Sequence, residues 1–365
     1  MFTSRPLVAS TPDRGRGSAF ARRLGALLLG ALLIGSVGLA PDAAAQQSVF
    51  EEAKQKYQFA EYEKATSLFK KVADNQQADV ELRRDAYRYL ARTHIARGQT
   101  DAARGAIESL VETNPPTDYL NPDVEPPAVM DLYYQVQKAQ SGSYEVQQEQ
   151  GLQTLAVMDF TNNSITRRED YEGLRKGLPA IMINNLTGGT DLQVIERERI
   201  EWLLDELKLQ ESGKVDQSTA VRTGELLGAN AVVFGSFIAT DGEMNISARV
   251  VKVETGEVLF GDQVQGGPDE FFAMIKELSQ KVTKSINVEM EETKLGANQT
   301  QSLDAMMAYS DGLSLLEAGK YREAQQKFRR ALEHDKNFAK ARKKIKSLKP
   351  MVASLDGESG SSSMR

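Results

Sequence analysis

The sequence of 365 residues contains no cysteine and only two histidines, His94 and His334, which lie 240 positions apart. Without cysteine the chain has no disulfide framework, no thiolate nucleophile and no Cys-ligated zinc or iron–sulfur site. It also lacks the lipidated Cys of a bacterial lipoprotein. Two distant histidines leave little for a His-based triad or a His-rich metal site. We therefore expect no enzyme, no bound metal, no cofactor and no lipoprotein anchor.

The first 45 residues have the layout of a secretory signal peptide. Four arginines between positions 14 and 23 precede an uncharged apolar run of 17 residues, Leu24–Ala40, and a proline follows it. Ala43 and Ala45 then supply the small residues of a cleavage site, which predicts cleavage between Ala45 and Gln46. The pattern is typical of bacterial Sec export.

Two alternatives stay open for this segment. The adjacent Arg22 and Arg23 allow a twin-arginine signal, and 17 apolar residues are near the lower limit for an uncleaved membrane anchor. Cleavage would remove five arginines and two aspartates, which changes the net charge from −6 to −9. An acidic chain is a poor nucleic-acid binder. We expect a periplasmic protein that spans no membrane after cleavage, is at most peripheral to the outer membrane, and binds other proteins.

The remaining chain predicts an α+β multidomain protein with helical regions on both sides of a mixed sheet. The expected regions are a signal peptide at 1–45, helical repeats at 46–140, a linker at 141–151, an α/β domain at 152–290, a linker at 291–302, a helix pair plus a basic helix at 303–350, and a disordered tail at 351–365.

Both helical regions carry small and aromatic residues at a repeated spacing. Ala65 and Phe69 recur as Ala103 and Ile107, with an offset of 38 residues. The pattern resembles the tetratricopeptide repeat, in which two helices approach closely where one presents Ala or Gly and the other an aromatic ring. Such arrays form a groove for an extended or helical peptide. The signature residues are Ala65, Phe69, Ala91, Gly98, Ala103, Ile107, Gly312, Gly319, Tyr321, Ala324, Phe328 and Ala331. The single C-terminal unit must pack on something else, in cis or on a partner.

The central region alternates short apolar strands with amphipathic helices. We expect strands near 155–160, 192–195, 231–238, 244–251 and 258–264, and helices near 173–186, 198–209, 218–227 and 268–288. The order βαβααβββα predicts a mixed sheet covered by helices. The alternation slips at Val250 and Val251, which predicts a β-bulge.

Three stretches of this region carry a family resemblance: LAVMDF at 155–160, VIERERIEWLLDELKLQESG at 194–213, and LLGANAVVFGSF with ARVVKVETGEVL between 226 and 259. They resemble the CsgG family, named for the curli-subunit secretion channel, and the related FlgO- and TolB-N-like envelope domains. The resemblance implies a periplasmic domain that oligomerises and acts in export or assembly at the outer membrane. Its signature residues are Asp159, Phe160, Glu196, Arg197, Leu204, Gly213, Gly228, Gly235 and Gly256.

The chain departs from the pore-forming member of that family, which resembles this domain with two long membrane-inserting hairpins added. Here the corresponding places are short and polar, at 240–243 and 261–268. We therefore expect a non-enzymatic adaptor that binds protein partners through its repeats and oligomerises or docks on outer-membrane machinery. Alternatives are a soluble component of a curli-type secretion channel complex, and a small-ligand receptor or enzyme that uses the α/β cleft.

The helix expected at 198–209 raises the question of catalytic carboxylates. Its acidic residues include Glu198 and Glu201, which could form an acid–base pair. Their helical spacing favours a solvated polar face instead. Glu196 and Arg197 are interpreted as a cap or a subunit contact, and Trp202 as the flank of a core or an anchor for a partner.

Overall fold

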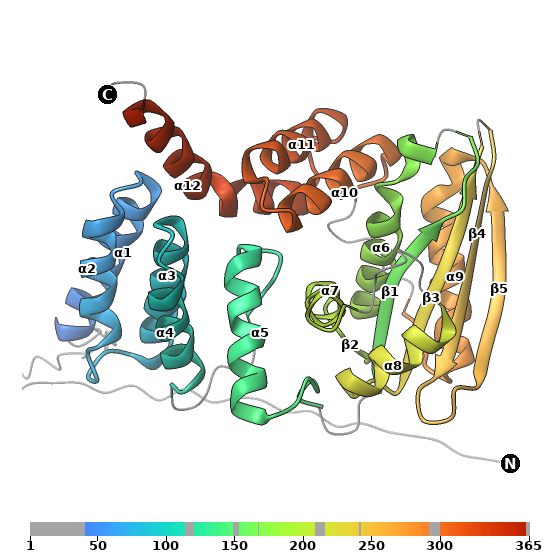
Figure 1. Cartoon of the computed structure of the whole chain (residues 1–365), viewed down its shortest axis with the longest axis horizontal. Helices are drawn as coiled ribbons and strands as arrows, with labels where there is room; N and C mark the ends of the chain where they lie inside the picture. The colour runs from blue at the N-terminus through green and yellow to red at the C-terminus, as the bar shows by residue number, and fades with distance from the viewer. Residues whose placement is uncertain are drawn as a thin grey trace, which may run out of the picture. The chain divides into compact units, whose positions relative to one another are not determined.

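The computed structural model describes residues 41–113, 120–148, 153–166, 168–208, 216–240, 242–291 and 300–362. These residues hold helices at both ends of the chain and a five-stranded mixed sheet between them (Figure 1). The α+β class and the helix–sheet–helix order are thereby confirmed. The apolar run of the expected signal peptide and Gly213 lie outside the described residues.

Five helices precede the sheet: α1 (Pro41–Gln58), α2 (Tyr62–Ala73), α3 (Val80–Ala96), α4 (Thr100–Val111) and α5 (Pro127–Ser141). Two of their ends carry a clear sequence signal. Asp79 caps α3 by accepting hydrogen bonds from the amides of Glu81 and Leu82, and Gly142 ends α5 in the left-handed conformation. The expected cleavage site, Ala45–Gln46, lies in the first turns of α1.

The sheet has the strand order β2-β1-β3-β4-β5, with β1 (Thr154–Asn162), β2 (Gln193–Val194), β3 (Ala231–Ala239), β4 (Met244–Lys252) and β5 (Val258–Gly266). β1 pairs in parallel with β2 and β3, because helices connect these strands, whereas β3, β4 and β5 pair antiparallel through short turns. The register of β4 and β5 shifts between Val250 and Val251, which confirms the predicted bulge.

Helices cover both faces of the sheet and give the chain two hydrophobic cores. The helices are α6 (Leu174–Gly189), α7 (Arg197–Glu206), α8 (Gln217–Leu227) and α9 (Phe271–Ser285). One core joins a sheet face to α6, α9 and the C-terminal helices, and the other joins the opposite face to α7, α8 and the N-terminal helices. Alternate strand residues divide between them, as Val232 and Val233 do. Each helical region therefore shares a core with the sheet domain.

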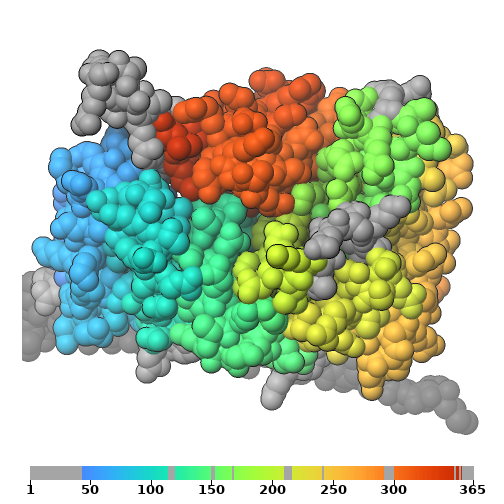
Figure 2. Space-filling model, viewed as in Figure 1, coloured from blue at the N-terminus to red at the C-terminus, as the bar shows by residue number. Residues whose placement is uncertain are grey.

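The C-terminal region consists of α10 (Leu303–Glu317), α11 (Tyr321–His334) and α12 (Ala339–Ser362). It packs in cis, since α10 lies against α6 and α12 contacts α1 and α3 (Figures 1 and 2). Gly173 and Gly177 of α6 allow this approach. A Cβ atom at Gly177 would lie 2.6 Å from Ser310 Oγ, and one at Gly173 would lie 2.8 Å from Asp311 Oδ1.

Two ends differ from the sequence predictions. β5 extends to Gly266, because residues 261–266 pair with β4 along the sheet edge, so the second expected insertion point is a strand. α12 continues to Ser362 rather than ending near Leu348, and Met351 and Val352 are buried on it. Within the described residues, no helix has the length and apolar character needed to cross a membrane.

Candidate functional site

The N-terminus of α7 lies where the sheet domain meets both helical regions. Glu196 precedes the helix with an extended backbone, and its Oε2 accepts a hydrogen bond from the Tyr134 hydroxyl of α5 at 2.9 Å. Burial raises the pKa of Glu196 to about 7, although the hydrogen bond from Tyr134 opposes that shift. Glu196 therefore contacts the N-terminal helices and does not cap α7.

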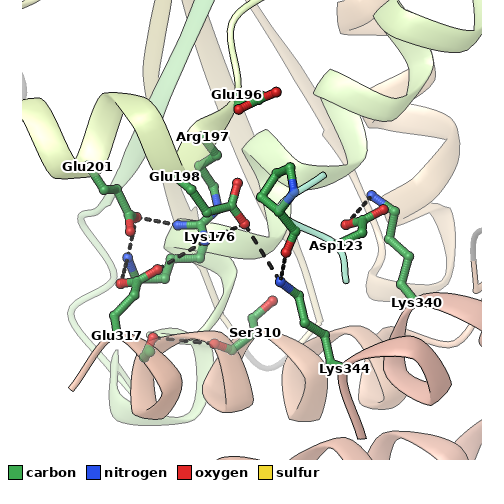
Figure 3. Close-up of polar contacts among 12 residues, drawn as sticks. Asp123, Lys176, Glu196, Arg197, Glu198, Glu201, Ser310, Glu317, Lys340 and Lys344 are labelled. Atoms are coloured by element: carbon green, nitrogen blue, oxygen red, sulfur yellow. Dashed lines mark hydrogen bonds and ion pairs between the residues drawn. The ribbon is translucent and has the colours of Figure 1, made fainter. Parts of the chain in front are cut away.

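Five charged side chains form a network that we call the polar cluster: Asp159, Lys176, Arg197, Glu201 and Glu317 (Figure 3). Glu317, at 31%, has the most exposed side chain of the five. Lys176 Nζ lies 3.4 Å from Asp159 Oδ2 and 2.6 Å from Glu317 Oε2. Arg197 Nη2 lies 3.0 Å from Glu317 Oε1, and both cations also contact Glu201. The cluster joins β1, α6 and α7 of the sheet domain to the last residue of α10.

The three carboxyl groups of this cluster face two cations, and Arg197 Nη2 also lies 3.6 Å from Glu198 Oε1. Burial raises the pKa of Glu201 well above its ordinary value, against the opposing effect of Arg197 and Lys176. The side chain of Glu317 is 31% exposed. Its partial burial would raise its pKa, but Arg197 and a hydrogen bond with Glu201 hold that pKa below the ordinary range. The pKa values of Glu201 and Glu317 are therefore shifted in opposite directions.

A second buried cation ties α12 to the same place. Lys344 has only 2% of its surface exposed, and its ammonium group donates a hydrogen bond to the Pro122 carbonyl (Figure 3). The nearest carboxylate is Glu198, at 3.9 Å. Burial lowers the pKa of Lys344, which is the expected sign for an ammonium group removed from water. The loop before α5 is thus held between α7 and α12.

A cavity of about 350 Å³, the acidic cavity, opens beside the polar cluster between α5, α7, α10 and α12. Its carboxylate-bearing residues are Glu125, Asp131, Glu198, Glu201, Asp205, Glu206 and Glu317. Arg197 and Lys344 are the cations in its lining, and both contact carboxylates. Burial, with Asp205 and Glu317 nearby, raises the pKa of Asp131 to about 6. The carboxylates that line the acidic cavity therefore repel one another.

The repeat-signature residues lie at helix contacts. Gly312 faces the ring of Phe328, where a Cβ atom would lie 2.6 Å from Cε1, so only glycine allows this helix crossing. Gly98 and Gly319 adopt positive φ at the ends of their helices, and Tyr321 is half-buried. The fully buried members are Ala65, Phe69, Ala91, Ala103, Ile107, Ala324, Phe328 and Ala331.

The CsgG-like signature residues are divided between the polar cluster and the scaffold. Asp159 and Arg197 belong to the cluster, while Phe160 and Leu204 are buried in opposite cores. Gly235 lies against the Phe160 ring, where a Cβ atom would lie 2.5 Å from Cε1. The remaining two glycines, Gly228 and Gly256, end α8 and form the β4–β5 turn with positive φ.

The prediction of a solvated acidic face on α7 is wrong for Glu201, whose side chain is only 13% exposed. The end of α10 covers this side of α7, and the sequence treats α10 as a separate unit. Trp202 is buried at 7% exposure between the rings of Tyr134 and Tyr144, so it forms part of a core.

Sequence reasoning missed Lys176, Glu317 and Lys344. Two signals could have found them. Gly173 and Gly177 lie one helical turn apart, which marks a place where another helix comes close. Lys344 falls within the apolar stripe of Ala341, Ile345 and Leu348, which marks a buried cation. In the described chain, no group of three or more His, Asp or Glu residues is placed to hold a metal ion.

Residues 137–245 match the family model of CsgG, the curli production assembly/transport component. The match covers less than a third of the chain. It begins in α5 and ends at the start of β4, so it includes the polar-cluster residues of β1, α6 and α7 but not Glu317 of α10. The chain therefore contains a CsgG-like domain in its middle. No curated protein matches the sequence.

Solved structures of three other proteins show partial similarity to the chain. The C-terminal domain of LpoB from Salmonella enterica is 19% identical, with 32% of this chain and 87% of that chain covered and a TM-score of 0.24. Lipoprotein GNA1162 from Neisseria meningitidis is 14% identical, with 31% and 79% covered and a TM-score of 0.23. TolB from Acinetobacter baumannii is 11% identical, with 37% and 27% covered and a TM-score of 0.22.

Proposed function

We propose that this protein is an exported, non-enzymatic adaptor of the bacterial envelope, which binds protein partners through tetratricopeptide-like helices attached to a CsgG-like domain. The observation that carries the proposal is the CsgG match at 137–245 within a domain that shares its two cores with helical regions from both ends of the chain. The adaptor would work as one body, because its partner-binding helices share hydrophobic cores with its docking domain. The CsgG-like domain would oligomerise or dock on outer-membrane assembly or secretion machinery.

The ion pairs where the sheet domain meets the C-terminal helices support a structural role for the polar cluster. The carboxylates of the polar cluster pair with Lys176 and Arg197, so these ion pairs join α10 to the sheet domain. The proposal gives the protein no catalytic residue, cofactor or metal. Its absence of cysteine supports a form that carries no lipid anchor. Signal-peptide cleavage before Gln46 would shorten the start of α1. Of the α1 residues that it removes, Ala43, Ala44 and Ala45 are not buried.

The first experiment tests export and location. The full chain with a C-terminal tag is expressed in a Gram-negative host, its N-terminus is sequenced, and its membranes are washed with carbonate. We expect an N-terminus at Gln46 and release into the soluble fraction. A protein that keeps residues 1–45, or that stays in the membranes after the carbonate wash, would overturn the proposal.

The second experiment tests partner binding. The tagged mature chain is cross-linked in the envelope of its source bacterium, beside a variant, Lys176→Met, that disturbs the polar cluster. We expect defined partners with the native chain and fewer with the variant. A native chain that purifies alone as a monomer would contradict the adaptor role.

A second candidate is a soluble component of a curli-type secretion complex, which the description of the matched family favours. The same cross-linking distinguishes it, since this role requires a membrane-inserted channel protein among the captured partners.

A further inference from the structure

Gln46 is the residue that signal-peptide cleavage would make the first of the mature chain. Ala43 and Ala45 precede it as the small residues of the cleavage site, and cleavage after Ala45 would leave the α-amine of Gln46 free. A glutamine with a free α-amine can close a five-membered ring, because its side-chain amide carbon lies at the right distance along its own chain. Whether the ring forms depends on what holds the side chain in place.

The side-chain carbonyl of Gln46 is not held by a hydrogen bond. Its Oε1 is buried and accepts no hydrogen bond from the described residues. A buried acceptor without a donor is costly. The neighbouring Gln47 differs, since its Nε2 donates to Glu51 Oε1 at 3.1 Å, one turn further along α1. The amide carbonyl of Gln46 therefore has no such contact to lose when a ring closes.

The charge at the start of the shortened α1 also favours a closed ring. After cleavage the helix would begin at Gln46, and its first N–H groups would have no partners within the helix. A positive α-amine at this end is unfavourable, because the helix dipole is already positive there. Residues 46–49 include no Asp or Glu to offset that charge. A ring that removes the charge would therefore stabilise the start of α1.

The first contact of α1 with the core lies one helical turn beyond Gln46. Phe50 is 3% exposed, and its ring lies edge-on to those of Phe69 and Tyr89, with both centroid distances at 5.7 Å. Loss of the first turn from a free end would therefore bring the chain terminus to Phe50. A closed ring at residue 46 would block that loss, because an aminopeptidase requires a free α-amine.

We propose that Gln46 is converted to pyroglutamate by its own α-amine once the signal peptide has been removed. This inference rests on the cleavage within the proposed function and adds a covalent modification to it. The α-amine nitrogen attacks Cδ, the new N–Cδ bond closes the ring, and the Cδ–Nε2 bond breaks. Nε2 leaves as ammonia with the proton that the amine gives up, so the reaction needs no oxidant or co-reactant. The mature chain then begins with a neutral lactam in place of an ammonium group.

The test begins with the exported protein. The full chain with a C-terminal tag is purified from a Gram-negative host, and its N-terminal peptide is identified by mass spectrometry, because a closed ring leaves no free amine for chemical sequencing. We expect a peptide that starts at residue 46 and is lighter than its sequence by one ammonia. 

A second preparation follows the reaction itself. A cytoplasmic fusion is cut in vitro directly before Gln46, which gives the mature chain with an open amine. We expect it to convert to the lighter form in buffer alone, at a rate that does not change on dilution, because the reaction is intramolecular.

Two variants locate the modification. The shorter side chain of Gln46→Asn would have to close a strained four-membered ring, so this variant should keep its open amine. Gln47→Asn is the matched control, since it leaves residue 46 unaltered and should be modified like the native chain. Treated with an aminopeptidase, Gln46→Asn should lose residues of the first turn, whereas the native chain and Gln47→Asn should keep them.

The outcomes separate this inference from the proposed function. A peptide that starts at Gln46 with its full mass would overturn the modification and leave export intact. A chain that keeps residues 1–45, or that begins at another residue, would overturn cleavage at Gln46 and the modification with it. Loss of ammonia from Gln46→Asn would assign the reaction to another residue, and an open form that persists in buffer would overturn unaided ring closure.

Discussion

The two helical regions join the same sheet domain by different chemistry. The C-terminal helices join it through close helix packing at Gly173 and Gly177 and through the polar cluster, where charges must balance. The N-terminal helices join it through aromatic area, with Trp202 between Tyr134 and Tyr144. A junction of balanced charges depends on each of its members, whereas a junction of apolar area weakens in proportion to the area lost.

Arg197→Leu should have the largest effect. It leaves the three carboxyl groups of the polar cluster, two of them largely buried, beside a single cation, so we expect the free energy of unfolding to fall by about 3–5 kcal/mol. Urea denaturation measures the change. Arg222→Ala is the control, since Arg222 is exposed and pairs with exposed Glu225, and it should cost less than about 0.5 kcal/mol. Equal losses for the two variants would contradict the charge-balance account.

Trp202→Leu tests the aromatic junction and should cost about 2–3 kcal/mol, because part of the apolar area is retained. The ring centroids of Tyr134 and Tyr144 lie 5.6 and 5.7 Å from that of Trp202, so both contacts weaken together. Urea denaturation followed by circular dichroism gives the value. A loss larger than that of Arg197→Leu would reverse the comparison.

Glu196→Gln tests an ionisable contact of the aromatic junction, the hydrogen bond between Tyr134 and Glu196. Burial raises the folded-state pKa of Glu196 to about 7, so stability present below the unfolded value of about 4.5 is lost as pH rises through about 7. The amide avoids this loss and still accepts from Tyr134. At pH 8 the variant should be more stable by about 1–3 kcal/mol, and at pH 4 it should match the native chain.

Urea midpoints at the two pH values measure this difference. Glu63→Gln serves as the control, because the side chain of Glu63 is 86% exposed, and it should show no such pH dependence. A Glu196→Gln variant that is less stable than the native chain at pH 8 would refute the assignment.

Gly177→Ala sharpens the comparison on the C-terminal side, with the smallest expected effect. The added methyl group meets Ser310 Oγ at 2.6 Å, so overpacking should cost about 1–2 kcal/mol despite the better helix propensity of alanine. Gly105→Ala is a matched control within α4, where nothing lies within 4 Å of the new methyl group. It should raise stability by about 0.5–1 kcal/mol, as thermal unfolding of the two variants will show.

Local signals were sufficient for most elements of the sheet domain. The loss of alternation at Val250 located the bulge, and Gly228 located the end of α8. The ends of elements that depend on contacts with distant parts of the chain could not be predicted from local signals. β5 extends to Gly266 because β4 supplies hydrogen bonds there, even though the segment is polar and glycine-rich. α12 extends because Met351 and Val352 find a surface to bury against.

The candidate site was predicted only in part, for a related reason. Asp159 and Arg197 stood out through the family resemblance, but their partners Lys176 and Glu317 carry no local sign of burial. Glu317 ends a helix more than 100 residues beyond Glu201, and only the fold brings them together. Helical spacing identifies the polar face of a helix, but it does not show whether a second charged helix covers that face.

The contact of α12 with α1 and α3 sets the order in which the chain can finish folding. Contacts between segments so distant in sequence close a long loop and form late. During synthesis the ribosome releases Lys344 only after more than nine-tenths of the chain has been made. Until then the Pro122 carbonyl lacks the ammonium group that donates to it. A nascent chain that has not yet released α12 therefore lacks these contacts with α1 and α3.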